Sequence, residues 1–161
     1  MKAIYADLHI HTSNDSNKLN DQYDTEKLIT KIKEYAKSEN ILISLTDHNR
    51  INKEAYLKLC GKTVFLVGVE LHIRNIDDCD PYHCHFYFDL TDKDLSNEID
   101  KLNEILIELY PNPMPSNKDK IPKIFDVVNK FNDYDFLVLP HGGQSHSTFD
   151  VSIPKDMIFD T

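Results

Sequence analysis

Short apolar runs alternate with amphipathic segments along most of this chain. Runs of strand length lie at residues 41–45, 64–67, 86–88 and 136–138, and a further apolar start precedes residue 7. Between several of them, apolar residues recur at intervals of three or four, which is the spacing of one helix face. This alternation is typical of βαβ units, and it predicts an α/β protein built on a largely parallel sheet.

The clearest predicted helix begins after Asp24 or Thr25, either of which can act as its N-cap. Its apolar residues share one face while its lysines point to water, and the pattern ends between residues 38 and 40. Three further helices are predicted at residues 53–59, 96–110 and 121–131. In the last of these, Pro122 lies in the first turn, where a missing backbone N–H is tolerated.

Glycine and proline mark where two of these helices end. Gly61 suits the C-terminal cap of the second helix. Pro111, Pro113 and Pro115 follow the third helix and stop it. The loop at residues 112–120 is polar, and we expect it to act as a mobile lid or as a linker.

The composition is that of an ordinary globular chain, since 40% of the 161 residues are hydrophobic and 28% are charged. This length gives room for one domain with a real core, which we expect to span residues 1–161. The net charge is -9, and no lysine or arginine block marks a nucleic-acid surface. Bound divalent cations would offset part of that charge, so the argument against nucleic acid is weak.

The cysteines and the N-terminus indicate the compartment. There are 3 cysteines with no Cys-x-x-Cys spacing, so a disulfide framework is not expected and a reducing cytoplasm fits. The N-terminus lacks the apolar run of a signal peptide, and no later segment approaches membrane-spanning length. We therefore expect a cytoplasmic protein that begins at Met1 and has no membrane partner.

Candidate metal ligands recur beside these apolar runs. His9 and His11 are two residues apart, and in a strand such residues point to the same face. Because the carboxyl ends of parallel strands gather at one edge of a sheet, ligands there would converge. The further candidates that end or open an apolar run are Asp47, His48, Glu70, His83, His85 and His141.

This set of side chains favours a transition metal centre. Imidazole together with carboxylate suits Zn, Mn or Fe, whereas a Ca or Mg cage would normally be all oxygen. Glu70 can bridge two ions with its two oxygens. Two ions held close together can clamp the attacking and leaving oxygens of a phosphoester and can lower the pKa of bound water.

Four motifs occur in the order found in the polymerase and histidinol phosphatase (PHP) domain phosphoesterases, which the chain resembles. They lie at residues 7–12 (DLHIHT), 46–48 (TDH), 68–70 (GVE) and 140–141 (PH). The family has another histidine between the third and fourth motifs. His83 is the better-spaced candidate for it and His85 the alternative. The resemblance spans residues 7 to 143.

The resemblance implies a distorted (β/α) barrel that carries two or three divalent metal ions. His9 and His11 would hold one ion, and Glu70 would bridge it to a second. His83 and His141 would complete the second ion, and His48 would belong to a third. The implied activity is phosphate-ester hydrolysis by a hydroxide at this centre, with Glu70, His48 and Asp47 as the catalytic group and Asp47 orienting a ligand histidine.

Two departures from the family pattern affect these expectations. Only Asp15 lies near the place of the loop residue that helps hold a third metal, and it is set one or two residues early. The final Asp-x-His motif has no counterpart before Thr161, so the chain looks like the front portion of a barrel. Either the gene is truncated, or the missing ligand comes from water, from His146 or from another polypeptide.

The sequence indicates the class of substrate and partner less narrowly than it indicates the metal ligands. Arg50 and Arg74 lie just past two ligand motifs and would suit a substrate phosphate, although ordinary surface charge explains them equally well. His72 is expected to be a polar surface residue. The region after His141 is similar to PHP modules that precede ATPase regions. A phosphorylated small molecule is the expected substrate; a nuclease acting on nucleic-acid ends beside an ATPase domain and a non-catalytic metal-binding domain are the alternatives.

Overall fold

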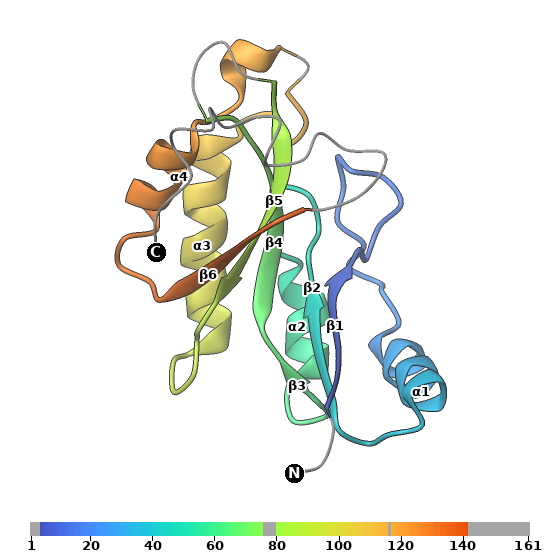
Figure 1. Cartoon of the computed structure of the whole chain (residues 1–161). Helices are drawn as coiled ribbons and strands as arrows, with labels where there is room; N and C mark the ends of the chain where they lie inside the picture. The colour runs from blue at the N-terminus through green and yellow to red at the C-terminus, as the bar shows by residue number, and fades with distance from the viewer. Residues whose placement is uncertain (1–3, 76–79, 116, 142–161) are drawn as a thin grey trace, which may run out of the picture.

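The computed structural model describes residues 4–75, 80–115 and 117–141. Its strands form two three-stranded sheets that lie side by side (Figure 1). The first sheet is parallel, in the order β1-β2-β3, and consists of β1 (Tyr5–Ile10), β2 (Ile41–Leu45) and β3 (Val64–Phe65). The second is antiparallel, in the order β4-β5-β6, and consists of β4 (Val67–Ile73), β5 (Tyr82–Phe88) and β6 (Phe136–Pro140).

The helices agree closely with the sequence pattern, with one exception. They are α1 (Thr25–Ala36), α2 (Lys53–Leu59), α3 (Leu95–Leu109) and α4 (Ile124–Lys130), with a short 3₁₀ helix η1 (Lys118–Lys120) in the predicted loop. Asp24 caps α1, because its Oδ1 accepts the backbone N–H of Lys27 at 2.9 Å. Gly61 follows α2 with a φ of 72°, as a C-terminal cap requires. The first three predicted helices are therefore confirmed.

The fourth helix begins three residues later than predicted, and Pro122 lies outside it. The segment before the helix is extended because it pairs with the end of β4. Arg74 donates its N–H to the carbonyl of Pro122 at 3.0 Å, and Ile124 donates to the carbonyl of Arg74 at 2.8 Å. This backbone pairing, which the local sequence pattern does not encode, displaces the start of α4.

The prediction of a largely parallel sheet is wrong for half of the strands. Only eight residues separate the end of β4 at Ile73 from the start of β5 at Tyr82, fewer than a parallel crossover needs, and the two strands pair antiparallel. β4 also continues to Ile73, which places Glu70 in the middle of a strand and not at its end. The structure is thus mixed α/β, and the described residues form two open sheets without a closed barrel.

Strict alternation gives the antiparallel sheet two different faces. One face carries buried apolar side chains, among them Leu71 and Phe86, and α3 runs alongside this sheet (Figure 1). The opposite face carries Glu70 and His72 on β4 directly opposite His85 and His83 on β5. A strand sends successive side chains to opposite faces, so the ladder that buries the core also aligns the ligand candidates.

The two sheets join at a seam that is also held by hydrogen bonds. Beyond β2, an isolated parallel bridge pairs His48 with Glu70. Glu70 donates its N–H to the carbonyl of Asp47 at 3.1 Å, and Asn49 donates to the carbonyl of Glu70 at 2.8 Å. The buried Tyr56 hydroxyl strengthens the seam, because it accepts the N–H groups of Leu45 at 2.9 Å and Gly68 at 2.8 Å.

In the part of the chain that the structure describes, no helix has the length and apolar character needed to cross a bilayer.

Gly68 packs closely against Ser44 and Thr46 across the seam, and we predict that Gly68→Ala destabilises the protein. An added Cβ would lie 2.3 Å from Ser44 Oγ, 3.0 Å from Thr46 Cγ2 and 3.1 Å from a ring carbon of Tyr87. Overpacking of this kind costs about 1–3 kcal/mol in the free energy of unfolding, which urea denaturation measures. In a Ser44→Ala background the same substitution should cost less, because the nearest atom is gone. Equal costs in the two backgrounds would contradict the packing argument.

Candidate metal centre

Side chains from both sheets converge on the buried carboxylate of Glu70. His9 comes from β1, His48 follows β2, and His85 comes from β5. Glu70 is 1% exposed although it carries a charge. A buried carboxylate is costly unless it is paired, so the imidazoles around it are a condition of the fold as well as of any chemistry. The side chains gathered here are those of His9, His11, His48, Glu70, His83, His85 and His141.

The first of two ligand groups consists of His9, Glu70, His85 and His141. One donor atom from each lies within 4.8 Å of all the others. His9 Nε2 is 3.1 Å from Glu70 Oε2, and His85 Nε2 is 3.7 Å from the same oxygen. The ring of His141 is 4.7 Å from that of His9, measured between centroids. Four donors around one point are enough for a tetrahedral metal site.

The second group consists of His11, His48 and Glu70. Its donor atoms also lie within 4.8 Å of one another. His11 Nε2 is 3.1 Å from Glu70 Oε2, and His48 Nδ1 is 4.0 Å from it. The rings of His11 and His48 are stacked at 4.7 Å. Glu70 belongs to both groups, and this shared carboxylate joins them into one centre.

Within the described part of the chain, two of the ligand atoms are buried without the hydrogen-bond partner that a buried nitrogen needs. Nδ1 of His48 and Nε2 of His85 are buried and have no hydrogen-bond partner among the described residues. Buried polar atoms are normally satisfied, so such an atom needs an explanation. An ion in each group would supply the missing partner. Imidazole and carboxylate together suit Zn, Mn or Fe.

The electrostatics of the centre hold Glu70 and His48 in the forms that bind a cation. Burial alone would raise the pKa of Glu70, but hydrogen bonds from histidines, His11 and His83 foremost, outweigh it and hold that pKa well below its usual range. Burial lowers the pKa of His48 to about 4, so its ring is neutral at pH 7. A carboxylate that is ionised and an imidazole that is neutral are the forms that coordinate metals.

The grouping in space differs from the one that the family resemblance implies. His9 and His11 fall into different groups, and His85 joins His9 where His83 was the better-spaced candidate. His83 instead makes a short hydrogen bond from Nδ1 to the second oxygen of Glu70. Asp15 is in neither group, and His146 lies outside the described residues.

Asp47 holds the turn that carries His11. Its Oδ1 accepts the N–H of Thr12 and its Oδ2 accepts the Thr12 hydroxyl, both at 2.7 Å. Asn52 donates its side-chain amide to the same hydroxyl at 2.7 Å. All three residues are buried, and burial raises the pKa of Asp47. With both oxygens engaged, Asp47 is placed to fix the position of His11 relative to His48.

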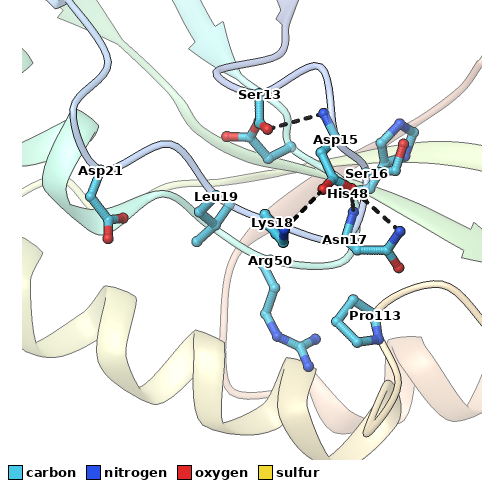
Figure 2. Close-up of a pocket in the computed structure, with 11 residues that line it drawn as sticks. Ser13, Asp15, Ser16, Asn17, Lys18, Leu19, Asp21, His48, Arg50 and Pro113 are labelled. Carbon is cyan, nitrogen blue, oxygen red and sulfur yellow. Dashed lines mark hydrogen bonds and ion pairs between the residues drawn. The ribbon is translucent and has the colours of Figure 1, made fainter.

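Both arginines bind backbone carbonyls. The Arg50 guanidinium donates to the carbonyls of Asn49, Leu106 and Tyr110 at 2.6, 3.0 and 2.6 Å. It thereby caps the C-terminal end of α3, towards which Figure 2 shows it pointing. Arg74 is 7% exposed and donates Nε to the carbonyl of Ile121 at 2.9 Å. These contacts favour structural roles over phosphate binding.

His72, which the sequence analysis expected to be a polar surface residue, lies beside the site. It is partly buried, its ring lies 4.9 Å from that of His83, and its Nδ1 has no hydrogen-bond partner among the described residues. Burial lowers its pKa to about 4. The available signal was its spacing of two from Glu70, which puts both on one face of a strand that continues past Glu70.

A pocket of about 440 Å³ opens beside the second ligand group. His48, Asp47 and Arg50 form part of its wall, and the loop after His11 forms the rest with Pro113 (Figure 2). Asp15 lies in this loop, where its carboxylate accepts the N–H of Asn17 at 3.0 Å. The volume is that of pockets that bind small molecules.

The comparisons with known proteins are weak. No protein-family model matches the chain, and no curated protein matches its sequence. Among solved structures, one similar protein is a candidate metal-dependent phosphoesterase from Bifidobacterium adolescentis, with a TM-score of 0.42 and 10% identity over 86% of this chain and 67% of that one. Another is an amidohydrolase from Chromobacterium violaceum, with a TM-score of 0.37 and 22% identity over 65% of this chain and 35% of that one. Both TM-scores are below 0.5, so only the geometry of the site indicates a function for this chain.

Glu70→Gln should abolish metal binding at both groups, because the amide keeps the shape but loses the shared anionic ligand. Elemental analysis of protein purified without chelators should find two ions per wild-type chain and fewer than one in the variant. Glu104→Gln, on the exposed face of α3, should leave the metal content unchanged. Equal metal content in Glu70→Gln and wild type would show that Glu70 is not a ligand.

His72→Gln should reduce the acid sensitivity of the metal-free protein. In the folded chain the pKa of His72 is about 4, so its ring stays neutral down to that pH, whereas in the unfolded chain it has the ordinary histidine pKa of 6.5. Below that value the unfolded state binds the extra proton, so stability falls as the pH drops from 6.5 towards 4. The loss in Tm between pH 7 and pH 5, measured in EDTA, should be smaller for the variant. An identical loss would contradict the assigned neutral state.

Proposed function

We propose that this protein is a metal-dependent phosphoesterase with a centre of two divalent ions. The observation that carries the proposal is that Glu70 belongs to both histidine groups. A single structural zinc site would need only one closed set of four ligands. Two adjoining groups that share one carboxylate instead suit paired ions, and paired ions suit the displacement of an alcohol from a phosphate ester.

The residues of the chain hold this centre in a fixed geometry. His9, His85 and His141 would hold one ion with Glu70, while His11 and His48 would hold the other. The hydrogen bond from His83 fixes the second oxygen of Glu70, and Asp47 fixes the turn after His11. Bound ions would lower the pKa of water and neutralise charge on the phosphate. Preorganisation of this kind is the protein's main contribution to such reactions.

The position of the pocket indicates where a substrate would lie. It adjoins the second group through His48, and most of the residues that line it have polar or charged side chains. The second group has three ligands from the described chain, so it has room for a water or a substrate oxygen. We therefore propose a phosphorylated small molecule as the substrate, bound with its ester oxygen towards the pocket. A nucleic-acid end, cleaved beside an ATPase partner, stays as the alternative substrate, and the cleavage of an oligonucleotide tests it.

The metal-loaded protein should hydrolyse p-nitrophenyl phosphate. EDTA should abolish turnover, and added Mn or Zn should restore it. Glu70→Gln should lower kcat by at least about a thousandfold, which corresponds to roughly 4 kcal/mol of transition-state stabilisation. Glu104→Gln is the matched control and should keep full activity.

A substrate panel separates the rival activities. Faster cleavage of bis-p-nitrophenyl phosphate or of an oligonucleotide than of the monoester would favour the nuclease. Full metal loading with no turnover of any of these substrates would reject catalysis by this chain and favour a metal-binding role.

A further inference from the structure

The loop at residues 13–19 is closed at its base by one buried side chain. The Asn52 amide donates to the Thr12 hydroxyl at 2.7 Å and to the carbonyl of Asn20 at 3.0 Å, so it holds the two ends of the loop together. Within the loop, Asp15 accepts the N–H of Asn17 at 3.0 Å, and its carbonyl accepts the N–H of Lys18, also at 3.0 Å. The loop is thus a compact projection with a fixed base.

This loop separates two pockets, each of which touches the second ligand group. On one side is the pocket of about 440 Å³ that includes His48. On the other side is a pocket of about 640 Å³ that includes His11. Lys18 lines both of them, as do Ser13, Asp15 and Leu19. Lys18 therefore borders both of the pockets that reach the second group.

Lys18 is the cation in these linings whose head group is not committed to the fold. Arg50 lines the first pocket, but its guanidinium caps α3. The Lys18 ammonium is 3.6 Å from the Asp15 carboxylate, and the two side chains are 78% and 47% exposed. An exposed pair of this kind is worth at most about 1 kcal/mol, so an anion with a higher charge can displace Asp15.

We propose that Lys18 binds the terminal phosphate of the substrate and selects dianionic phosphomonoesters over diesters. This inference rests on the proposed function, because the two ions would place the phosphate beside the second group. A phosphomonoester carries a charge near −2 at neutral pH, and an internal diester carries only −1. An ammonium that approaches the non-bridging oxygens therefore favours the monoester. Lys18 takes the role that the sequence suggested for Arg50 and Arg74.

Titration calorimetry with inorganic phosphate on the metal-loaded protein tests this role without relying on turnover. Lys18→Gln should weaken phosphate binding by roughly ten- to a hundredfold, the range expected for a charge-assisted hydrogen bond. Lys18→Arg should bind within a few-fold of wild type, because it keeps the charge. Raising the salt concentration should weaken the wild type more than Lys18→Gln. Metal content per chain should be the same in all variants.

The control for the role of Lys18 is another exposed lysine. Lys31→Gln removes an exposed lysine from α1 and should leave phosphate affinity unchanged. If Lys18→Gln binds phosphate as tightly as wild type, with the same salt dependence, the role of Lys18 is wrong and the proposed function stands. If the metal-loaded wild type binds no phosphate, both proposals fail.

Discussion

The buried carboxylate of Glu70 is the constraint around which both sheets are arranged. It sits in the middle of β4 and is almost completely excluded from water. Such a charge is tolerated only where other groups compensate it. Here histidines from three other segments of the chain contact it. The packing of the core therefore also brings the ligands together. The ions that we propose would supply a partner to the buried nitrogens of His48 and His85, which have none among the described residues.

The segment at residues 47–52 transmits this constraint to the rest of the molecule. Asp47 fixes the turn after β1, and His48 pairs with Glu70 across the seam. Asn49 has a φ of 53°, accepts the N–H of His72 and donates to the carbonyl of Pro113. Arg50 caps α3, and Asn52 closes the 13–19 loop. One short stretch therefore sets the positions of ligands, pocket wall and loop together.

The two faces of the antiparallel sheet carry different kinds of side chain, which explains how a small chain holds so many histidines. In β4 and β5 the apolar residues alternate with the polar ones, and the apolar set packs into the core. The histidines thereby occupy the opposite face without weakening that core. The proposed phosphoester hydrolysis would then depend on ligands held on or just after strands. The selectivity for monoesters over diesters would depend on the loop at residues 13–19. Strands give a fixed ligand geometry, and a loop adapts more easily to a substrate.

Local periodicity was enough to predict three of the helices and most of the strands, but it gave one strand from residue 64 to Glu70 where the structure has β3 and β4 in different sheets. Helical stripes and caps are encoded within a few residues, which is why α1, α2 and α3 follow the pattern. Pairs such as His9 and His11, or His83 and His85, were visible as residues two apart. The prediction that His72 lies on the surface was wrong, because β4 extends past Glu70.

Which strands pair, and in which direction, was decided only in three dimensions. The β4–β5 hairpin made half of the sheet structure antiparallel, and its register set His85 opposite Glu70 and His83 opposite His72. Other contacts between distant segments bind the two arginines to backbone carbonyls, whereas Lys18 lines the pockets. Sequence therefore determined which chemical groups this protein has and on which elements they lie. Tertiary structure decided which of them meet, because pairing depends on contacts between segments far apart in the chain.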